Sequence, residues 1–205
     1  MRVSPLGDDV SSAVPDEEIL RAQAYGLLAG LLSQAPDADA LRALSVMNGD
    51  DSPLGSAFAA LAAAARIATP EGVADEYGTL FIGVGGGELT PFGSYYRTGF
   101  LNEKPLAELR GDMARLGIAR ADDVKEPEDH IAALCEMMAG LITGAFGDPA
   151  DLGEQRAFYD RHIASWAPRF FVDLEGSPSA AFYRAVGTLG RRFLDIESQG
   201  FALTV

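Results

Sequence analysis

The chain has 205 residues, of which 48% are hydrophobic and 22% are charged, a composition that indicates one folded domain and excludes an intrinsically disordered protein. With 30 acidic residues against 16 basic ones, its net charge of −14 repels phosphate backbones and argues against a nucleic-acid partner. The same charge attracts basic peptides, with a strength that falls as the salt concentration rises.

The single cysteine, Cys135, excludes an internal disulfide and a cysteine-rich zinc site, and it indicates a reducing compartment. Residues 1–15 lack the apolar stretch of a secretory signal, so we expect a flexible N-terminus and a cytoplasmic protein. The longest apolar run, residues 57–65, is far shorter than the ~20 residues of a membrane-spanning helix. We therefore expect no stable insertion into a membrane.

Hydrophobic residues recur at helical spacing from residue 16 to residue 197, and no alternating run of β-branched residues predicts a strand. In the first half, the predicted helices centre on Gln23, Leu41, Phe58 and Tyr77. The first of them begins after Pro15 and is expected to bury one stripe of side chains, which consists of Leu20, Gln23, Leu27 and Leu31.

Residues 83–99 are rich in glycine and predict the longest irregular segment, a flexible hinge or loop between helical parts. The segment lacks the Lys-Ser/Thr of a P-loop, and Glu88 stands where a GxGxxG motif needs its third glycine. We therefore reject a nucleotide-binding interpretation of these glycines.

In the second half, the spacing predicts helices over residues 106–116, 131–142 and 155–166, with Pro168 bending or ending the third. The last helix is expected to open with Ser177 as its N-cap and Pro178 as its first residue, and a C-terminal tail is expected at residues 198–205. The predicted fold is all-α, a single globular bundle of about eight or more helices.

The densest polar cluster is Glu126-Pro127-Glu128-Asp129-His130. A proline followed by acids is typical of a stabilised helix start, which predicts that a helix begins at this cluster. This interpretation leaves His130 unexplained, because an imidazolium is disfavoured at the positive end of a helix, whereas Glu126 would share its face. The pair would then hold a peptide or orient a neighbouring loop.

The sequence gives less support to a metal site or to catalysis. A helical metal site needs a second histidine at matching spacing, and the other histidine, His162, lies on a different predicted helix. Cys135 lies on an apolar stripe and is expected to be a buried hydrophobic residue. Two alternatives stay open: a small hydrolase that acts on a nucleotide or phosphate ester through Glu126, Asp129 and His130, and a structural helical subunit of a larger complex.

Four segments, in this order, resemble the TorD/DmsD/NarJ family of redox-enzyme maturation chaperones, and the resemblance covers roughly residues 16–197. DEYGTLFIG (75–83) is similar to the family's Tyr-x-x-Leu-Phe segment, and TPFGSYY (90–96) is similar to its Pro-Tyr-Glu-Ser-x-Tyr loop. EPEDH (126–130) resembles its Glu-Pro-x-Asp-His signature, and QRAFYDRHIASW (155–166) resembles its Gln…Phe…His…Trp helix. The chain departs from the family at Gly93, which replaces the usual glutamate of the loop.

The resemblance implies a helical cytoplasmic chaperone with neither catalytic residues nor a cofactor or metal of its own. Its partner would be the twin-arginine signal peptide or N-terminus of a molybdenum-containing oxidoreductase, which it would hold for molybdopterin insertion before export. Proteins of molybdopterin cofactor biosynthesis would be further partners. The protein would be a monomer or an exchanged dimer.

Carried over by position, the resemblance also implies a peptide-binding site. Asp129 and Glu126 would meet peptide arginines, and His130 would orient Asp129 or make a polar contact of its own. The peptide-binding set is Tyr77, Phe81, Pro91, Ser94, Tyr96, Glu126, Pro127, Asp129 and His130, and the supporting set is Gln155, His162 and Trp166. The competing interpretation is that the peptide-binding set only packs a helix start against the glycine-rich loop.

Overall fold

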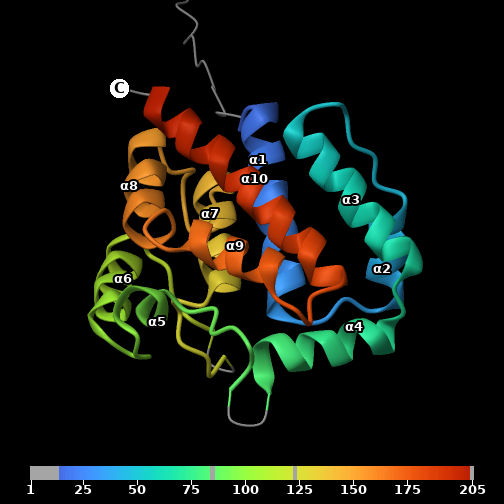
Figure 1. Cartoon of the computed structure of the whole chain (residues 1–205). Helices are drawn as coiled ribbons and strands as arrows, with labels where there is room; N and C mark the ends of the chain where they lie inside the picture. Colours follow the sequence, from blue (N-terminus) through green and yellow to red (C-terminus); the bar gives the residue numbers. More distant parts are fainter. Residues whose placement is uncertain (1–13, 84–85, 122–123, 204–205) are drawn as a thin grey trace, which may run out of the picture.

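The two longest helices lie antiparallel, side by side at the centre of the molecule (Figure 1). The structure is a computed structural model that describes residues 14–83, 86–121 and 124–203. Across these residues every regular element is helical, which confirms the predicted all-α fold. The first half contains α1 (Asp16–Ser33), α2 (Ala38–Ser45), α3 (Pro53–Ile67), α4 (Pro70–Tyr77) and one turn of π-helix (Gly78–Ile82). The second half contains α5 (Gly93–Thr98), α6 (Lys104–Arg115), α7 (Ile131–Thr143), α8 (Leu152–His162), α9 (Ala167–Gly176) and α10 (Phe182–Leu203).

The core forms where α1 packs on α7 and where α9 and α3 pack on α10. On α1 the fully buried side chains are Tyr25, Leu28 and Leu32, which recur at helical spacing and share one face. This is not the stripe that the sequence predicted. Leu20 is 65% exposed, and only Leu31 of the predicted stripe is buried. Leu27 is only partly buried at the edge of the core, so this second apolar face of α1 is incompletely covered.

The last helix begins later and ends later than predicted. The Glu76 carboxylate on α4 accepts three hydrogen bonds from backbone N–H groups at the start of this helix. The donors are Ala181, Phe182 and Tyr183, at 2.8, 3.0 and 2.7 Å. Ser177 instead follows the C-terminus of α9, so its predicted role as N-cap is wrong. The helix continues to Leu203, through most of the predicted tail, because Phe201 is buried in the core.

The predicted loop at residues 83–99 is partly helical, since α5 occupies its second half. Before α5, the chain lies close against the π-helical turn: Leu89 N–H donates to the Leu80 carbonyl at 2.9 Å. A Cβ at Gly87 would lie 2.4 Å from the same carbonyl oxygen, so this approach requires glycine. The Glu88 carboxylate accepts hydrogen bonds from the hydroxyls of Ser177 and Ser179. Over residues 86–92 the segment is thus tied to the helical body.

Pro168 neither bends nor ends α8. That helix ends at His162, and Pro168 lies in the first turn of α9, a position where its missing N–H has no intrahelical partner to lose. Within residues 14–83, 86–121 and 124–203, no helix has the length and apolar character that crossing a membrane requires.

Candidate functional site

Two of the predicted motifs lie side by side, joined through their backbones. The Asp129 carbonyl accepts a hydrogen bond from Gly93 N–H at 2.9 Å, and the Pro91 carbonyl accepts one from Ile131 N–H at 2.9 Å. Phe92 and His130 thereby form a short antiparallel bridge. The TPFGSYY and EPEDH segments are therefore one structural unit.

Asp129 stabilises the start of α5. Its Oδ2 accepts a hydrogen bond from Ser94 N–H at 2.6 Å, where a negative charge complements the free N–H groups of the first turn. The residue is only 3% exposed, and its Oδ1 and the Ser94 hydroxyl have no hydrogen-bond partner among the described residues. A peptide arginine would reach this carboxylate only if the unit opened.

His130 is the N-cap of α7. Its Nδ1 accepts a hydrogen bond from Ala132 N–H at 3.1 Å, which requires an unprotonated nitrogen, and burial lowers the pKa of His130 to about 4. The helix begins at Ile131, so the prediction that it starts at the acidic cluster is wrong. Glu126 and His130 consequently share no helical face.

A pocket of about 370 Å³ lies beside this unit, and Glu126, Pro127 and His130 contribute to its lining. Arg110 donates to the carboxylate of Glu128 at 2.8 and 3.0 Å. Burial opposes the charge of Glu128, but hydrogen bonds and the positive charges of Arg110 and Arg120 together outweigh it and lower the pKa of the carboxyl group. Of the predicted peptide-binding residues, the structure thus brings Glu126, Pro127 and His130 together at one pocket.

The aromatic part of the predicted site is mostly core. The Tyr77 hydroxyl donates to the carbonyls of Leu32 and Ser33 at 3.2 and 3.0 Å, which satisfies the free C-terminus of α1. The Tyr77 ring packs against Phe81, with centroids 5.0 Å apart. Burial and the nearby charge of Glu126 raise the pKa of Tyr77. Tyr77 is thus not among the residues that line the pocket.

Trp166 packs against the start of α5 and against Tyr96 of the same helix. Their ring centroids are 5.3 Å apart, and Tyr96 donates to Asp173 at 3.1 Å. Trp166 Nε1 donates to the His162 carbonyl at 2.7 Å. A Cβ at Gly93 would lie 2.9 Å from that Nε1, so the indole covers the helix start only because residue 93 is glycine.

The other two supporting residues lie on α8, and the one at its end, His162, lines a small cavity with Gly93, Asp129 and Trp166. His162 Nε2 lies 2.7 Å from Asp112 Oδ2, and burial lowers the pKa of His162 although Asp112 opposes this. Gln155, near the start of α8, accepts a hydrogen bond from Arg21 at 3.1 Å. Across the described ranges, no three His, Cys, Asp or Glu side chains gather as a metal site would require.

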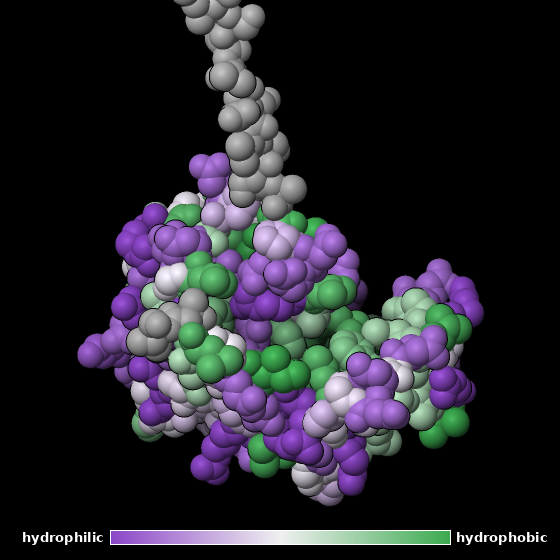
Figure 2. Space-filling view, turned by 90° about the horizontal axis from the view of Figure 1, so that it is seen from above, coloured by the Kyte–Doolittle hydropathy of each residue, from purple (hydrophilic) through white to green (hydrophobic). Residues whose placement is uncertain are grey.

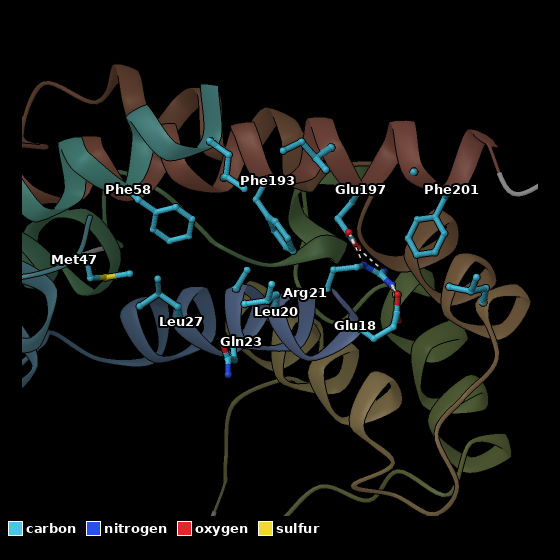
Figure 3. A pocket seen from close by; sticks show the side chains of 15 residues that line it. Glu18, Leu20, Arg21, Gln23, Leu27, Met47, Phe58, Phe193, Glu197 and Phe201 are labelled. Carbon is cyan, nitrogen blue, oxygen red and sulfur yellow. Dashed lines mark hydrogen bonds and ion pairs between the residues drawn. The ribbon is translucent and has the colours of Figure 1, made fainter. Parts of the chain in front are cut away.

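A larger concave feature was not predicted from the sequence. It is a groove of about 680 Å³ between α1, α3 and α10, and hydrophobic residues line its hollow (Figure 2). Its apolar lining comes from Leu20, Ala24 and Leu27 of α1, Met47, Leu54 and Phe58 of the α2–α3 region, and Phe193, Ile196 and Phe201 of α10 (Figure 3). The missed signal was the stripe of Leu20, Gln23 and Leu27, which lines this groove.

One end of the groove is charged. Arg21 Nε and Nη2 donate to the Glu197 carboxylate at 2.8 Å each, and Arg21 Nη1 donates to Glu18 at 2.7 Å (Figure 3). The Tyr25 hydroxyl also donates to Glu197, at 2.8 Å, and the Arg21 guanidinium lies over the Phe201 ring at 5.2 Å. Burial opposes the charge of Arg21, but the two carboxylates outweigh it and raise the pKa of the guanidinium.

Comparison with known proteins identifies relatives. The family described as "Nitrate reductase delta subunit" matches residues 48–172, more than half of the chain. A "Chaperone protein TorD" from Vibrio atlanticus is 30% identical over 122 residues, which are 55% of this chain and 56% of that protein. One from Photobacterium profundum is 28% identical over 134 residues, 62% of each protein. The match thus spans less than two thirds of these relatives.

A solved structure has the same fold. A redox enzyme maturation protein from Archaeoglobus fulgidus superposes with a TM-score of 0.55 at 18% identity, over 92% of this chain and 99% of that one. At this identity the likeness establishes the arrangement of the helices.

Proposed function

Because this chain belongs to the nitrate reductase delta subunit family, we propose that it is a non-enzymatic chaperone that binds the N-terminal segment of a molybdenum-containing oxidoreductase during assembly. The client segment is a twin-arginine signal peptide or the equivalent N-terminus. The chaperone acts in the cytoplasm, and it holds the enzyme until molybdopterin is inserted.

The groove between α1, α3 and α10 is the observation that carries this proposal. Apolar side chains from three elements face a volume that no described part of the chain fills. A buried Leu or Phe side chain contributes roughly 1.5–3 kcal/mol, so a few apolar residues of a peptide supply a useful share of micromolar binding, about −8 kcal/mol. An apolar helix or extended segment fits such a groove.

The EPEDH unit has a second role in the proposal. Glu126 and His130 face the smaller pocket, and we keep the sequence-based prediction that this pocket contacts the client. Asp129 acts there as a positioning residue, because its carboxylate holds α5. The hydrolase alternative gains nothing from the same geometry, since Asp129 and His130 both serve as helix caps.

Isothermal titration calorimetry tests the proposal, with N-terminal peptides of molybdenum oxidoreductases from the same genome. We expect micromolar binding that weakens with salt, and a loss of at least tenfold for Leu27→Glu or Phe58→Glu, which place a charge inside the groove. The matched control is Ile67→Glu on α3, whose side chain is 87% exposed and outside the groove. The absence of binding to any such peptide contradicts the proposal, and permanent co-purification with a larger complex supports a structural subunit instead.

A further inference from the structure

The groove between α1, α3 and α10 has two chemically different ends. Figure 3 shows Glu18, Arg21, Glu197 and Phe201 at one end, and Met47 and Phe58 at the other. Resting on the proposed function, we infer that the groove binds its peptide in one direction. A peptide arginine lies at Glu18, and the apolar residues that follow it lie toward Phe58.

The charged end carries an excess negative charge. Two carboxylates, Glu18 and Glu197, meet a single guanidinium, that of Arg21. Glu197 is 3% exposed and binds Arg21 through both oxygens, whereas the side chain of Glu18 is 18% exposed. The excess negative charge that a peptide can reach therefore lies on Glu18. The exposed acids Asp16 and Glu17 lie next to it, in the first turn of α1.

Glu18 has room for a second cationic partner. Both of its oxygens accept from Arg21 Nη1, at 2.7 Å each, and Oε2 also accepts a longer hydrogen bond from Gln155 Nε2 at 3.4 Å, whereas an ionised carboxylate offers about four acceptor sites. An arginine guanidinium is the cation that best hydrogen-bonds a carboxylate. Arg21 repels a peptide arginine only weakly, because the Glu197 carboxylate binds its Nε and Nη2 and offsets its positive charge.

The opposite end disfavours a charge. Its lining residues, Leu27, Met47, Leu54 and Phe58, are uncharged, and an arginine placed among them would lose hydration without gaining a carboxylate. A reversed peptide would also bring its apolar residues to Glu18. The peptide therefore runs parallel to α1, from the end at Glu18 toward the end at Leu27. These two positions are about 14 Å apart on the helix, which is the length of about nine helical or four extended peptide residues.

The first experiment measures the coupling between Glu18 and the peptide arginine. The probe is a synthetic peptide in which two arginines precede a segment rich in leucine and alanine, together with its variant in which both arginines are glutamine. We expect Glu18→Gln to weaken binding of the arginine peptide about tenfold and to leave binding of the glutamine peptide unchanged. Glu17→Gln, in the same turn but outside the groove lining, should change both affinities less than twofold. An equal loss for both peptides overturns the assignment of Glu18.

The second experiment measures direction, by photo-crosslinking the same peptide with a benzoylphenylalanine at either end. A label after the apolar segment should react with Met47, and a label before the arginines should react near Phe201, as mapped by mass spectrometry. The reverse pattern, or crosslinks elsewhere while calorimetry shows binding, overturns the inference and leaves the proposed function standing. A peptide that does not bind at all overturns both.

Discussion

The carboxylate of Asp129 accepts a hydrogen bond from the backbone N–H of Ser94 at 2.6 Å, across 35 residues of sequence. This bond links the acidic motif to the start of α5, and the backbone bonds of Gly93 and Ile131 flank it. Because the carboxylate is buried at the start of α5, its negative charge mainly stabilises that helix.

Asp129→Asn tests whether this carboxylate positions the loop or contacts the client. Asparagine keeps an acceptor for Ser94 N–H but removes the charge, so we expect the free energy of unfolding to fall by about 1 kcal/mol in urea titrations. Peptide affinity should change less than threefold. A loss of tenfold or more at unchanged stability would instead place the carboxylate against a peptide arginine, as the motif alone predicted.

Glu76 caps α10 from a different helix, and its removal should destabilise the whole molecule. Glu76→Ala leaves three N–H groups without their acceptor, and we expect the free energy of unfolding to fall by about 2 kcal/mol. Glu76→Gln, which keeps an acceptor oxygen, should lose about half as much. Asp75→Ala, the exposed neighbour on the same helix, is the control, and an equal loss for this variant would show that the cap contributes nothing.

The boundaries of α7 and α10 show what sequence periodicity leaves open. Repeats of hydrophobic residues predicted that these segments are helical, because the spacing reports local geometry. It did not predict where α10 begins, because α10 starts where the Glu76 carboxylate of α4 accepts its first N–H groups. For α7 the wrong start came from the acidic cluster, which did not show that the neutral imidazole of His130 accepts Ala132 N–H. Both starts depend on tertiary contacts or burial that a local pattern does not contain.

The groove shows a second limit. Leu20 and Leu27 were predicted to be core because they are apolar and helically spaced, but periodicity marks an apolar face without saying what covers it. The residues that meet them, Met47, Phe58 and Phe193, come from distant parts of the chain. The TPFGSYY and EPEDH segments, which the resemblance assigned to one binding site, lie side by side, and their role in binding stays a prediction.

His130 should make stability depend on pH. Burial lowers its pKa from 6.5 to about 4, so between these values the unfolded chain binds more protons than the folded one. The free energy of unfolding therefore falls as the pH is lowered from 6.5 towards 4, by roughly 3 kcal/mol in total for this group.

His130→Asn separates this contribution from that of other groups. Asparagine is a good N-cap acceptor that does not titrate, so the variant should lose less stability than the parent between pH 7 and pH 5 in urea titrations. Burial also lowers the pKa of His162, which remains in both proteins and cancels in the comparison. Identical pH slopes for parent and variant would contradict a neutral, buried His130.

Gly93→Ala tests the contact between the start of α5 and the indole of Trp166. The added Cβ would lie 2.9 Å from Nε1 and 3.2 Å from Cε2, closer than packed side chains allow. We expect the indole to shift and the free energy of unfolding to fall by about 1–3 kcal/mol, the range for overpacking in a core. Trp166 is the sole tryptophan of the chain, so its fluorescence spectrum reports this displacement directly.

The control is Gly111→Ala in α6, where a Cβ meets no atom within 4 Å and the better helix propensity of alanine should stabilise the protein by about 0.5–1 kcal/mol. If Gly93→Ala leaves both the emission spectrum and the stability unchanged, the indole of Trp166 accommodates the added methyl group. The contact with Trp166 would then not be the reason that residue 93 is glycine.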